Sequence, residues 1–259
     1  MHAVRGKVCS VCGDRVLSSY AETDAHGLRQ CPICRRIERP FDRAVAYGDY
    51  QGGLRELIHL LKYNGVRPAA KVLGRMLAHS LIALGPEFEQ AKLERGMFGE
   101  TAILVIPVPL FKTKRRQRGF NQAELIARSA LKSYPEPGRL QLASEMLLRI
   151  RDTASQIGLT NHQRRENLRG AFIVPHTAEV AKEIKNREVL LVDDVYTTGS
   201  TATECARVLR RAGASQVWVA TVARTLKLAS NYEFRPGTGE DAEALAEERD
   251  AVSAKDAGS

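Results

Sequence analysis

The chain has 259 residues, of which 44% are hydrophobic and 27% are charged, and its net charge at pH 7 is +9. This composition is typical of a soluble globular protein with one good-sized core and a small appendage. No apolar run approaches the roughly 18 residues that a membrane span needs, which excludes membrane insertion. The N-terminal MHAVRGKVCSVCG also lacks the apolar part of a secretory signal, so we expect a cytoplasmic protein.

The positive charge is unevenly distributed along the chain. Glu233–Ser259 contains eight acidic and three basic residues, so the preceding 232 residues carry a net charge of +14. A body this basic favours polyanionic ligands, either pyrophosphate or nucleic acid or both, although the alternative is that the charge serves solubility alone. The C-terminal part is also rich in alanine and poor in aromatic residues, and we predict that residues 230–259 form an acidic disordered tail.

Four of the five cysteines form two closely spaced pairs near the N-terminus. Cys9 and Cys12 make one C-x-x-C pair, and Cys31 and Cys34 make the second after 18 intervening residues. Each pair can present two thiolates to one ion, and the spacing is typical of a zinc ribbon with four sulfur ligands. A redox dithiol and an iron–sulfur site are the alternatives. We interpret residues 1–40 as a zinc-ribbon domain that takes its folding energy from structural Zn²⁺, because so short a segment cannot build its own core.

Pro40 marks the predicted start of the larger domain. Apolar residues at Leu54, Leu57, Ile58 and Leu61 have the i, i+3, i+4, i+7 spacing of an amphipathic helix. The predicted elements are a short strand or connector at Ala44–Tyr50, helices at Gly53–Lys62 and Pro68–Leu84, a turn at Tyr63–Gly65 and a polar connection at Gly85–Gly99.

A basic segment follows the next predicted strand, Thr101–Pro107. Lys112–Gly119 is predicted to be a loop with five positive charges, and a helix is expected from Phe120 to about Leu131. Arginines at the C-terminal end of a central strand can hold a pyrophosphate through bidentate hydrogen bonds. The residues assigned to pyrophosphate are therefore Arg115, Arg116 and Arg118. The alternative is a solvated basic loop.

The stretch from residue 135 to residue 188 is mostly polar. Asp152–Gly170 is long enough to be a functional lid or a disordered loop. The other predicted elements are a turn at Pro135–Gly138, strands at Leu147–Arg151 and Ala171–Val174, and a charged lead-in at Lys182–Glu188.

The stretch VLLVDDVYTTGST, residues 189–201, carries the clearest chemical signal. Its apolar part, Val189–Val192, predicts a strand buried on both faces of a parallel sheet. Asp193 and Asp194 are expected to follow the end of that strand, where ligands bind in open α/β sheets. Gly199 can adopt a positive φ and let the backbone approach a ligand closely.

A helix is predicted directly after these acids. Thr201 and Glu204 have the spacing of a capping box, and the helix should run to Arg211 and end at Gly213. The last predicted strand is Gln216–Ala223. Cys205 falls within the helix and is predicted to be a packed thiol, not a metal ligand.

The acids and the hydroxyl-rich loop suit different parts of one ligand. A loop at a helix N-terminus offers unpaired backbone N–H groups to a terminal phosphate. Carboxylates do not bind phosphate, but they suit vicinal hydroxyls or a hard cation. The combination predicts a sugar phosphate held with Mg²⁺, and it is not a P-loop because no lysine follows Gly199. The alternative is a buried strand followed by a chance acidic turn.

Residues 189–201 closely resemble the phosphoribosyl-pyrophosphate (PRPP) motif of type I phosphoribosyltransferases. The resemblance implies that Asp193 and Asp194 face the ribose hydroxyls of PRPP and orient the ribose during catalysis. It also implies a cradle for the 5′-phosphate formed by Thr197, Thr198, Gly199, Ser200 and Thr201.

The chain up to about residue 227 resembles the ComF competence-protein family. The matching segments are the two cysteine pairs, IPVPL at 106–110, RRQRGFNQAELIA at 115–127, RIRDTASQIGLTNHQRRENLRGAF at 149–172 and VDDVYTTGST at 192–201. The family implies an α/β type I phosphoribosyltransferase fold at residues 41–229, with a parallel sheet flanked by helices, behind a zinc ribbon. It also implies a role in DNA uptake for natural transformation.

Two classes of function remain open. In the first, the protein is a phosphoribosyltransferase that binds PRPP·Mg²⁺ and transfers the ribose to a nitrogen nucleophile. In the second, it is a competence factor that binds single-stranded DNA, with PRPP as a regulatory ligand or absent, and that contacts the DNA-uptake machinery. Only Phe111 and Phe120 border the basic segment, which weakens the prediction of a stacking groove for DNA.

Overall fold

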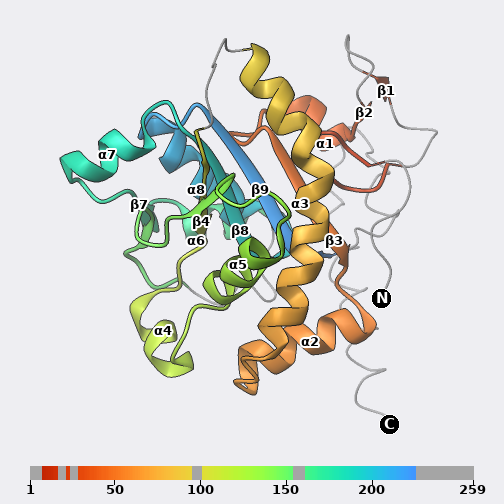
Figure 1. Ribbon diagram of the computed structural model, residues 1–259, viewed down its shortest axis with the longest axis vertical. Helices are drawn as coiled ribbons and strands as arrows, with labels where there is room; N and C mark the ends of the chain where they lie inside the picture. Colours follow the sequence, from red (N-terminus) through yellow and green to blue (C-terminus); the bar gives the residue numbers. More distant parts are fainter. Residues whose placement is uncertain (1–7, 17–21, 24–28, 95–100, 154–160, 226–259) are drawn as a thin grey trace, which may run out of the picture. The chain divides into compact units, whose positions relative to one another are not determined.

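A five-stranded parallel sheet organises the part of the chain that the computed structural model describes, residues 8–16, 22–23, 29–94, 101–153 and 161–225. The strand order is β3-β9-β8-β4-β5, and every neighbouring pair is parallel (Figure 1). The carboxyl ends of the five strands therefore meet at one edge of the sheet. The strands are β3 (Arg43–Asp49), β9 (Gln216–Arg224), β8 (Glu188–Tyr196), β4 (Ile103–Pro107) and β5 (Leu140–Leu142).

The central strand β8 divides its side chains between two buried cores. Val189 and Leu191 belong to one core, Leu190 and Val192 to the other, and all four are 0% exposed. This alternation follows from the period of two along a strand. The prediction of a strand buried on both faces is confirmed.

Helices supply the rest of both cores. One core takes residues from α2 (Gly52–Tyr63), α3 (Ala69–Glu94) and α5 (Gln122–Ser133), and Figure 1 shows α3 and α5 in front of the sheet. The other core takes residues from α1 (Pro32–Arg36), α6 (Asn161–Leu168), α7 (Ala178–Ile184) and α8 (Ser200–Arg211). The result is a helix–sheet–helix sandwich.

Among the described residues, five short elements lie outside the main sheet and its covering helices. The paired strands are β1 (Glu22–Thr23) with β2 (Arg29–Gln30) and β6 (Leu148–Arg149) with β7 (Phe172–Ile173), and the short helix is α4 (Lys112–Arg118). Among the described residues, no helix combines the length and the apolar composition of a membrane span.

The prediction that a polar connection starts at Gly85 is wrong, because α3 continues through Pro86 to Glu94. A proline inside a helix removes one backbone hydrogen bond. Side-chain contacts offset this loss: Phe88 is fully buried and packs edge-on against Trp218, with 5.1 Å between the ring centroids. Glu89 also forms an ion pair with Arg139, in which Glu89 Oε1 lies 2.5 Å from Arg139 Nη2.

Two more helices replace segments that were predicted to be irregular. Part of the predicted lid forms α6, whose Leu168 is buried against the sheet, and residues 154–160 of the lid lie outside the described residues. The charged lead-in overlaps α7, which begins at a Thr177 cap that accepts a hydrogen bond from Val180 N at 3.3 Å. The predicted disordered tail, residues 230–259, also lies outside the described residues.

Candidate functional site

The two acids lie inside β8 and not after its end. β8 continues to Tyr196 because β9 pairs with it as far as Arg224, with Asp193 opposite Thr221. On its other side, β4 pairs with β8 only as far as Val192. The prediction that both acids follow the strand is therefore wrong, but they do lie at the C-terminal edge of the sheet.

Lys62, at the C-terminal end of α2, is the cation closest to the acids. Its Nζ atom lies 2.5 Å from Asp194 Oδ2, and the two side chains are 17% and 6% exposed. Arg149 of β6 is a second cation near Asp193. The acids are thus charge-compensated by residues from two elements far apart in the sequence.

Burial shifts the protonation equilibria of this cluster. It raises the pKa of Asp193 to about 6, while Lys62 and Arg149 pull that pKa down. Burial also lowers the pKa of Lys62 to about 8, with Asp193 opposing the change and Arg118 adding to it. At a pH between these two values, Asp193 carries a negative charge and Lys62 carries a positive charge.

The hydroxyl-rich loop leads directly from β8 into α8. Gly199 has φ +77° and caps the helix, and Thr203 N donates to Gly199 O at 2.8 Å. The hydroxyls of Thr198 and Ser200 are 2.8 Å apart, and Ser200 N donates to Thr198 Oγ1 at 3.4 Å. The positive φ predicted for Gly199 is confirmed.

The predicted capping box at Thr201 and Glu204 does not form. Gly199 occupies the cap position, and the Glu204 carboxylate instead accepts from Gly170 N at 2.9 Å and pairs with Arg207. Gly199, as the cap residue, has no side chain that could accept a hydrogen bond from the first turn of α8. The backbone N–H groups of this turn and the positive end of the helix dipole can serve an anion.

The acid and the loop line one small cavity at the C-terminal edge of the sheet. Asp193 and Tyr196 of β8 and Thr221 of β9 are in its lining, together with apolar residues such as Leu191 and Val219. The loop residues in its lining are Thr197, Gly199, Ser200 and Thr201. Asp194 and Thr198, which were also predicted to belong to the site, are not in the lining of this cavity. A sugar phosphate with a charged end and a hydroxyl-bearing ring suits the chemistry of the polar residues that line it.

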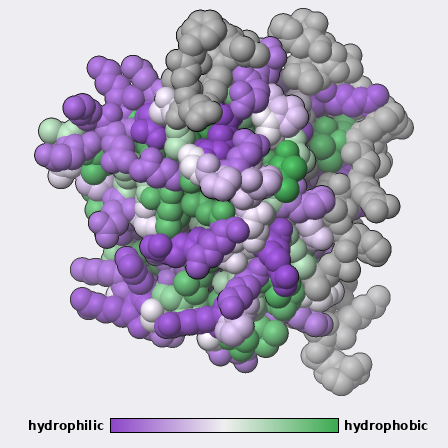
Figure 2. Space-filling view, in the orientation of Figure 1, coloured by the Kyte–Doolittle hydropathy of each residue, from purple (hydrophilic) through white to green (hydrophobic). Residues whose placement is uncertain are grey.

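The basic segment is a helix and not the loop predicted from the sequence. α4 spans Lys112–Arg118 and ends at Gly119, which has φ +77° and donates its N–H to Arg115 O at 2.8 Å. Arg115 and Arg116 are exposed, whereas Arg118 is half-buried. Hydrophilic side chains surround the region of α4 on the face shown in Figure 2.

Arg118 is the α4 arginine that lies near Lys62, the ion-pair partner of Asp194. Its guanidinium lies 5.9 Å from the centroid of the Tyr63 ring, and it contributes to the lowered pKa of Lys62. It also donates to Gln122 at the start of α5. Arg115 and Arg116 face solvent, where they can meet only a ligand that extends out of the site.

The four paired cysteines form one compact cluster. Their Sγ atoms all lie within 4.8 Å of one another, and those of Cys12 and Cys31 are 3.7 Å apart. A tetrahedral ion with sulfur ligands at about 2.3 Å separates the ligands by about 3.8 Å, so the geometry fits a metal. Cys31 N donates to Cys9 Sγ at 3.3 Å, a bond that favours the thiolate. Cys205 is buried in α8 outside this cluster, as predicted.

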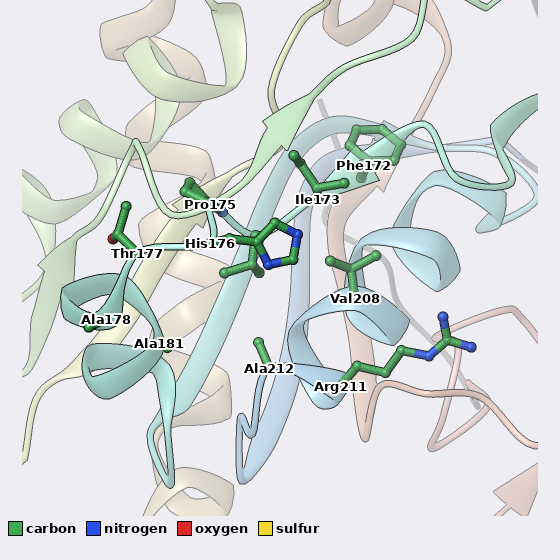
Figure 3. Close-up of a pocket in the computed structure, with 11 residues that line it drawn as sticks. Phe172, Ile173, Pro175, His176, Thr177, Ala178, Ala181, Val208, Arg211 and Ala212 are labelled. Carbon is green, nitrogen blue, oxygen red and sulfur yellow. The ribbon is translucent and has the colours of Figure 1, made fainter.

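Two larger cavities lie beside α8 and away from the acids. The first, of about 590 Å³, is mainly apolar and lies between α7 and α8, with His176 and Val208 in its lining (Figure 3). The second, of about 640 Å³, shares Val208 and reaches Ser200 and Thr203 at the start of α8. Neither cavity is lined by Asp193 or Asp194, so we place the site at the carboxyl ends of the sheet strands.

Sequence reasoning missed Lys62 and Arg149. Both lie in segments whose apolar pattern predicted only secondary structure, a helix at Gly53–Lys62 and a strand at Leu147–Arg151. The only available signal for Lys62 was its position directly before a turn. Its proximity to Asp194 depends on how α2 packs against the sheet, which no local pattern encodes.

Comparison with known proteins agrees with this geometry. The profile of the phosphoribosyl transferase domain family matches residues 137–236. DNA utilization protein YhgH of Escherichia coli K12 is 32% identical over 225 residues, which cover 85% of this chain and 91% of the relative. Competence protein F of Haemophilus influenzae is 29% identical over 229 residues, which cover 86% and 93%.

More distant matches cover less of the chain. A ribose-phosphate pyrophosphokinase of Methanopyrus kandleri is 34% identical over 107 residues, which cover 38% of this chain and 34% of the relative. A solved structure described as the allosteric regulatory enzyme of purine biosynthesis has a TM-score of 0.31 and 20% identity, and covers 60% of this chain and 25% of its own. The extensive matches to YhgH and competence protein F, together with the domain profile and the parallel sheet, show that the chain belongs to the ComF family and has a type I phosphoribosyltransferase fold.

Proposed function

We propose that the protein binds PRPP with Mg²⁺ at the C-terminal edge of the sheet. The observation that supports this proposal is the position of Asp193 beside the loop at the start of α8, because both line one cavity, of about 20 Å³, at the carboxyl ends of the strands. The loop supplies backbone N–H groups and hydroxyls for the 5′-phosphate. The acids supply acceptors for the ribose hydroxyls and for the cation.

The pyrophosphate of the ligand would lie toward the cations. Lys62 and Arg118 are near the acid pair, and Arg115 and Arg116 extend the positive charge outward along α4. When the anomeric C–O bond breaks, pyrophosphate leaves with the electron pair, and these cations stabilise its charge. A nitrogen nucleophile then attacks the anomeric carbon, the C–N bond forms, and the proton of the nucleophile passes to solvent. Mg²⁺, when bound, supplies further neutralisation of the pyrophosphate.

Isothermal titration calorimetry tests the binding step. We expect PRPP to bind with one site per chain and to bind more tightly with Mg²⁺ than without it. Ribose 5-phosphate, which lacks the pyrophosphate, should bind more weakly. Absence of PRPP binding in the presence of Mg²⁺ would contradict the proposal. Pyrophosphate release in the presence of a panel of nitrogen nucleophiles then tests turnover separately.

We place this activity in DNA uptake for natural transformation. The support is the family: the relatives are named for DNA utilisation and competence. The basic body of the chain suits a partner that is a polyanion. Deletion of the gene should lower transformation by external DNA without affecting growth in rich medium, and an unchanged transformation frequency would contradict this placement.

A second candidate function is direct binding of single-stranded DNA. The observation that favours it is Tyr63, which is 69% exposed and packs against His59 with 5.1 Å between the ring centroids. Arg118 lies against the same ring, so a stacking surface and a phosphate-binding cation adjoin. Tyr63→Ala should weaken binding of an oligonucleotide, while Tyr63→Phe, which keeps the ring, should not. Equal affinities of both variants would exclude stacking on Tyr63.

We further propose that the cysteine cluster binds structural zinc and that the chain divides at residues 1–40, 41–229 and 230–259. The geometry of the four thiols supports zinc, and an ion with four cysteine ligands has no open position for catalysis. Thiols of this kind persist in a reducing compartment, which supports a cytoplasmic location. Elemental analysis should find one zinc ion per chain, and iron in its place would contradict this assignment.

A further inference from the structure

The cysteine knuckle, defined as Cys9–Asp14, packs tightly against the edge strand β3. Ala44 N of β3 donates to Val11 O at 2.7 Å. Gly13 has φ +68°, and a Cβ atom added to it would lie 2.5 Å from Ala44 O and 3.1 Å from Arg224 Nη1. The approach is close enough to require glycine at this position. The knuckle is therefore in direct contact with the sheet that carries the acids.

Arg224, the last residue of β9, joins the knuckle to the sheet. Its side chain is 2% exposed. Nη1 donates to Cys12 O at 2.9 Å, and Nη2 lies 3.0 Å from Asp14 Oδ1. A buried guanidinium is stable only with such partners, so its position depends on an ordered knuckle.

Tyr196 carries the contact onward to the hydroxyl-rich loop. It is the last residue of β8, pairs with Arg224 in the sheet register and lies under its guanidinium, 5.4 Å from the ring centroid. A Cβ atom added to Gly199 would overlap the Tyr196 hydroxyl. Gly199 therefore packs directly against the Tyr196 ring.

Arg39 makes a second link between the cysteines and the loop. Its Nη1 atom donates to Thr203 Oγ1 in the first turn of α8 at 3.3 Å. The same guanidinium lies near Tyr196 and Cys34. Two buried or half-buried arginines thus connect the metal cluster to the start of α8.

We propose that Arg224 and Tyr196 are positioning residues that couple the cysteine metal site to the phosphate-binding loop. An ion held by the four cysteines orders the knuckle, the knuckle holds Arg224, and Arg224 holds Tyr196 beneath Gly199. A phosphate ligand that orders the loop then stabilises the metal site by the same amount. This inference rests on the proposed function, because it requires that the loop bind a phosphate.

Thermodynamic reciprocity makes the coupling measurable from the metal side. If the metal raises the affinity for the ligand by some factor, the ligand raises the affinity for the metal by the same factor. Couplings between sites of this kind are roughly 5- to 150-fold. The metal readout needs no catalytic turnover, so it is independent of the identity of the nucleophile.

The experiment measures zinc transfer from the purified full-length holoprotein to a chromogenic chelator. The equilibrium fraction of zinc retained is compared with no ligand, with ribose 5-phosphate and with PRPP plus Mg²⁺, and calorimetry under the same conditions shows whether each ligand binds. We expect either bound ligand to raise the apparent zinc affinity by about fivefold or more. The same retention of zinc with and without bound ligand would overturn the coupling.

Three variants locate the coupling. Tyr196→Leu removes the ring beneath Gly199, and Asp14→Asn with Arg224→Met removes both members of the buried pair. Either variant should still bind zinc but should lose the effect of ligand on zinc retention. Arg15→Met is the matched control, because Arg15 directly follows the knuckle and pairs with Asp49 of β3 through a side chain that is 47% exposed. It should retain the effect in full.

The possible outcomes separate this inference from the proposed function. If the wild-type protein binds neither ligand, the proposed function fails and the coupling fails with it. If ligand binds but zinc retention is unchanged, only the coupling fails. If Tyr196→Leu keeps the wild-type effect, the path through Tyr196 is wrong. Should the Asp14/Arg224 variant not fold, the wild-type comparison and Tyr196→Leu still decide.

Discussion

At the scale of single residues, the site depends on how Lys62 and Arg149 compensate the acids. Asp193 has a raised pKa because it is buried, and it remains ionisable near neutral pH because two cations are close. Asp194 has an ion-pair partner at 2.5 Å in Lys62. A ligand that brings hydroxyls and a cation must therefore compete with protons at Asp193 and with an ammonium group at Asp194.

PRPP binding should weaken as the pH falls through about 6, where Asp193 becomes protonated. The sign follows from linkage: the ligand and its cation favour the carboxylate, whereas burial favours the neutral acid. Calorimetric affinities between pH 5 and pH 8 measure this change. In Lys62→Met, the loss of a nearby positive charge should raise the pKa of Asp193 further and move the inflexion to higher pH. The ligand's own phosphate titration is the same in both proteins, so an unmoved inflexion would contradict the assignment.

Gly199→Ala should weaken binding of ribose 5-phosphate and lower the melting temperature. An alanine at φ +77° is strained, by about 1 to 3 kcal/mol, and its Cβ would overlap the Tyr196 hydroxyl. Gly170→Ala is the matched control, because Gly170 also has a positive φ, +66°, but has open space where a Cβ would lie. Both variants should lose stability, and only Gly199→Ala should lose phosphate affinity. Equal phosphate affinities would show that the loop does not hold the phosphate.

At the scale of elements, local sequence predicted the central strands β4, β8 and β9 but not the short strand β5, and it missed or shortened several of the helices around them. β8, β9 and β4 are apolar runs that are typical of buried strands, and α5 follows the cap residue Asn121, whose side chain accepts a hydrogen bond from Ala123 N. The acids and the loop were found because strand, acids, glycine and helix are contiguous in the sequence. Lys62 was missed because tertiary packing alone brings α2 to the acids.

The errors have a common physical origin. α4 contains five basic residues, a composition that predicted a loop. Charged side chains that face solvent are also compatible with a short helix, and this one ends at Gly119. α3 passes Pro86 because Phe88 is buried against Trp218, a contact made across the fold. In each case, a tertiary contact or an exposed helix face overrode the local signal.

Replacement of Arg115, Arg116 and Arg118 by alanine distinguishes the two candidate functions of α4. If α4 serves pyrophosphate, PRPP affinity should fall strongly while ribose 5-phosphate affinity changes little, because the charge-assisted bonds to the pyrophosphate are removed. If α4 serves DNA, oligonucleotide affinity should fall for all sequences, and the log–log salt slope should flatten by about 0.7 for each DNA phosphate that the variant no longer neutralises.

A triple variant of exposed bases on other helices controls for net charge. Lys71, Arg128 and Lys132 are exposed on α3 and α5, and their replacement by alanine changes the charge equally. We expect the α4 variant to reduce PRPP affinity and the control to leave it unchanged. Unchanged PRPP affinity with a flattened salt slope would contradict the transferase proposal and favour a DNA-binding protein.

At the scale of the whole molecule, the cysteine cluster and the sheet are not energetically separate. The four cysteines belong to the same buried core as Val189 and Leu191 of β8. Arg224 adds a buried ion pair between the knuckle and β9. Loss of the metal is therefore expected to affect the sheet edge that carries the site.

Cys9→Ser should abolish stoichiometric zinc binding and lower the melting temperature of the whole chain. The reason is that the metal supplies folding energy to a segment that packs on the main core. Elemental analysis and thermal unfolding followed by circular dichroism measure the two effects. Cys205→Ser is the control, because Cys205 is buried in α8 outside the cluster, and it should retain zinc. A Cys9→Ser protein with full zinc content would contradict the assignment of the ligands.

The central claim is that the C-terminal edge of the sheet binds PRPP through the acid pair. Calorimetric titration of PRPP with Mg²⁺ into wild type, Asp193→Asn/Asp194→Asn and the exposed-acid control Glu145→Gln tests it most directly. Asparagine has nearly the same shape as aspartate, so the double variant should keep the wild-type circular dichroism spectrum even though Asp194 loses its ion pair with Lys62. It should show no measurable PRPP binding, while Glu145→Gln binds as wild type. A folded double variant that binds PRPP as tightly as wild type would contradict the account.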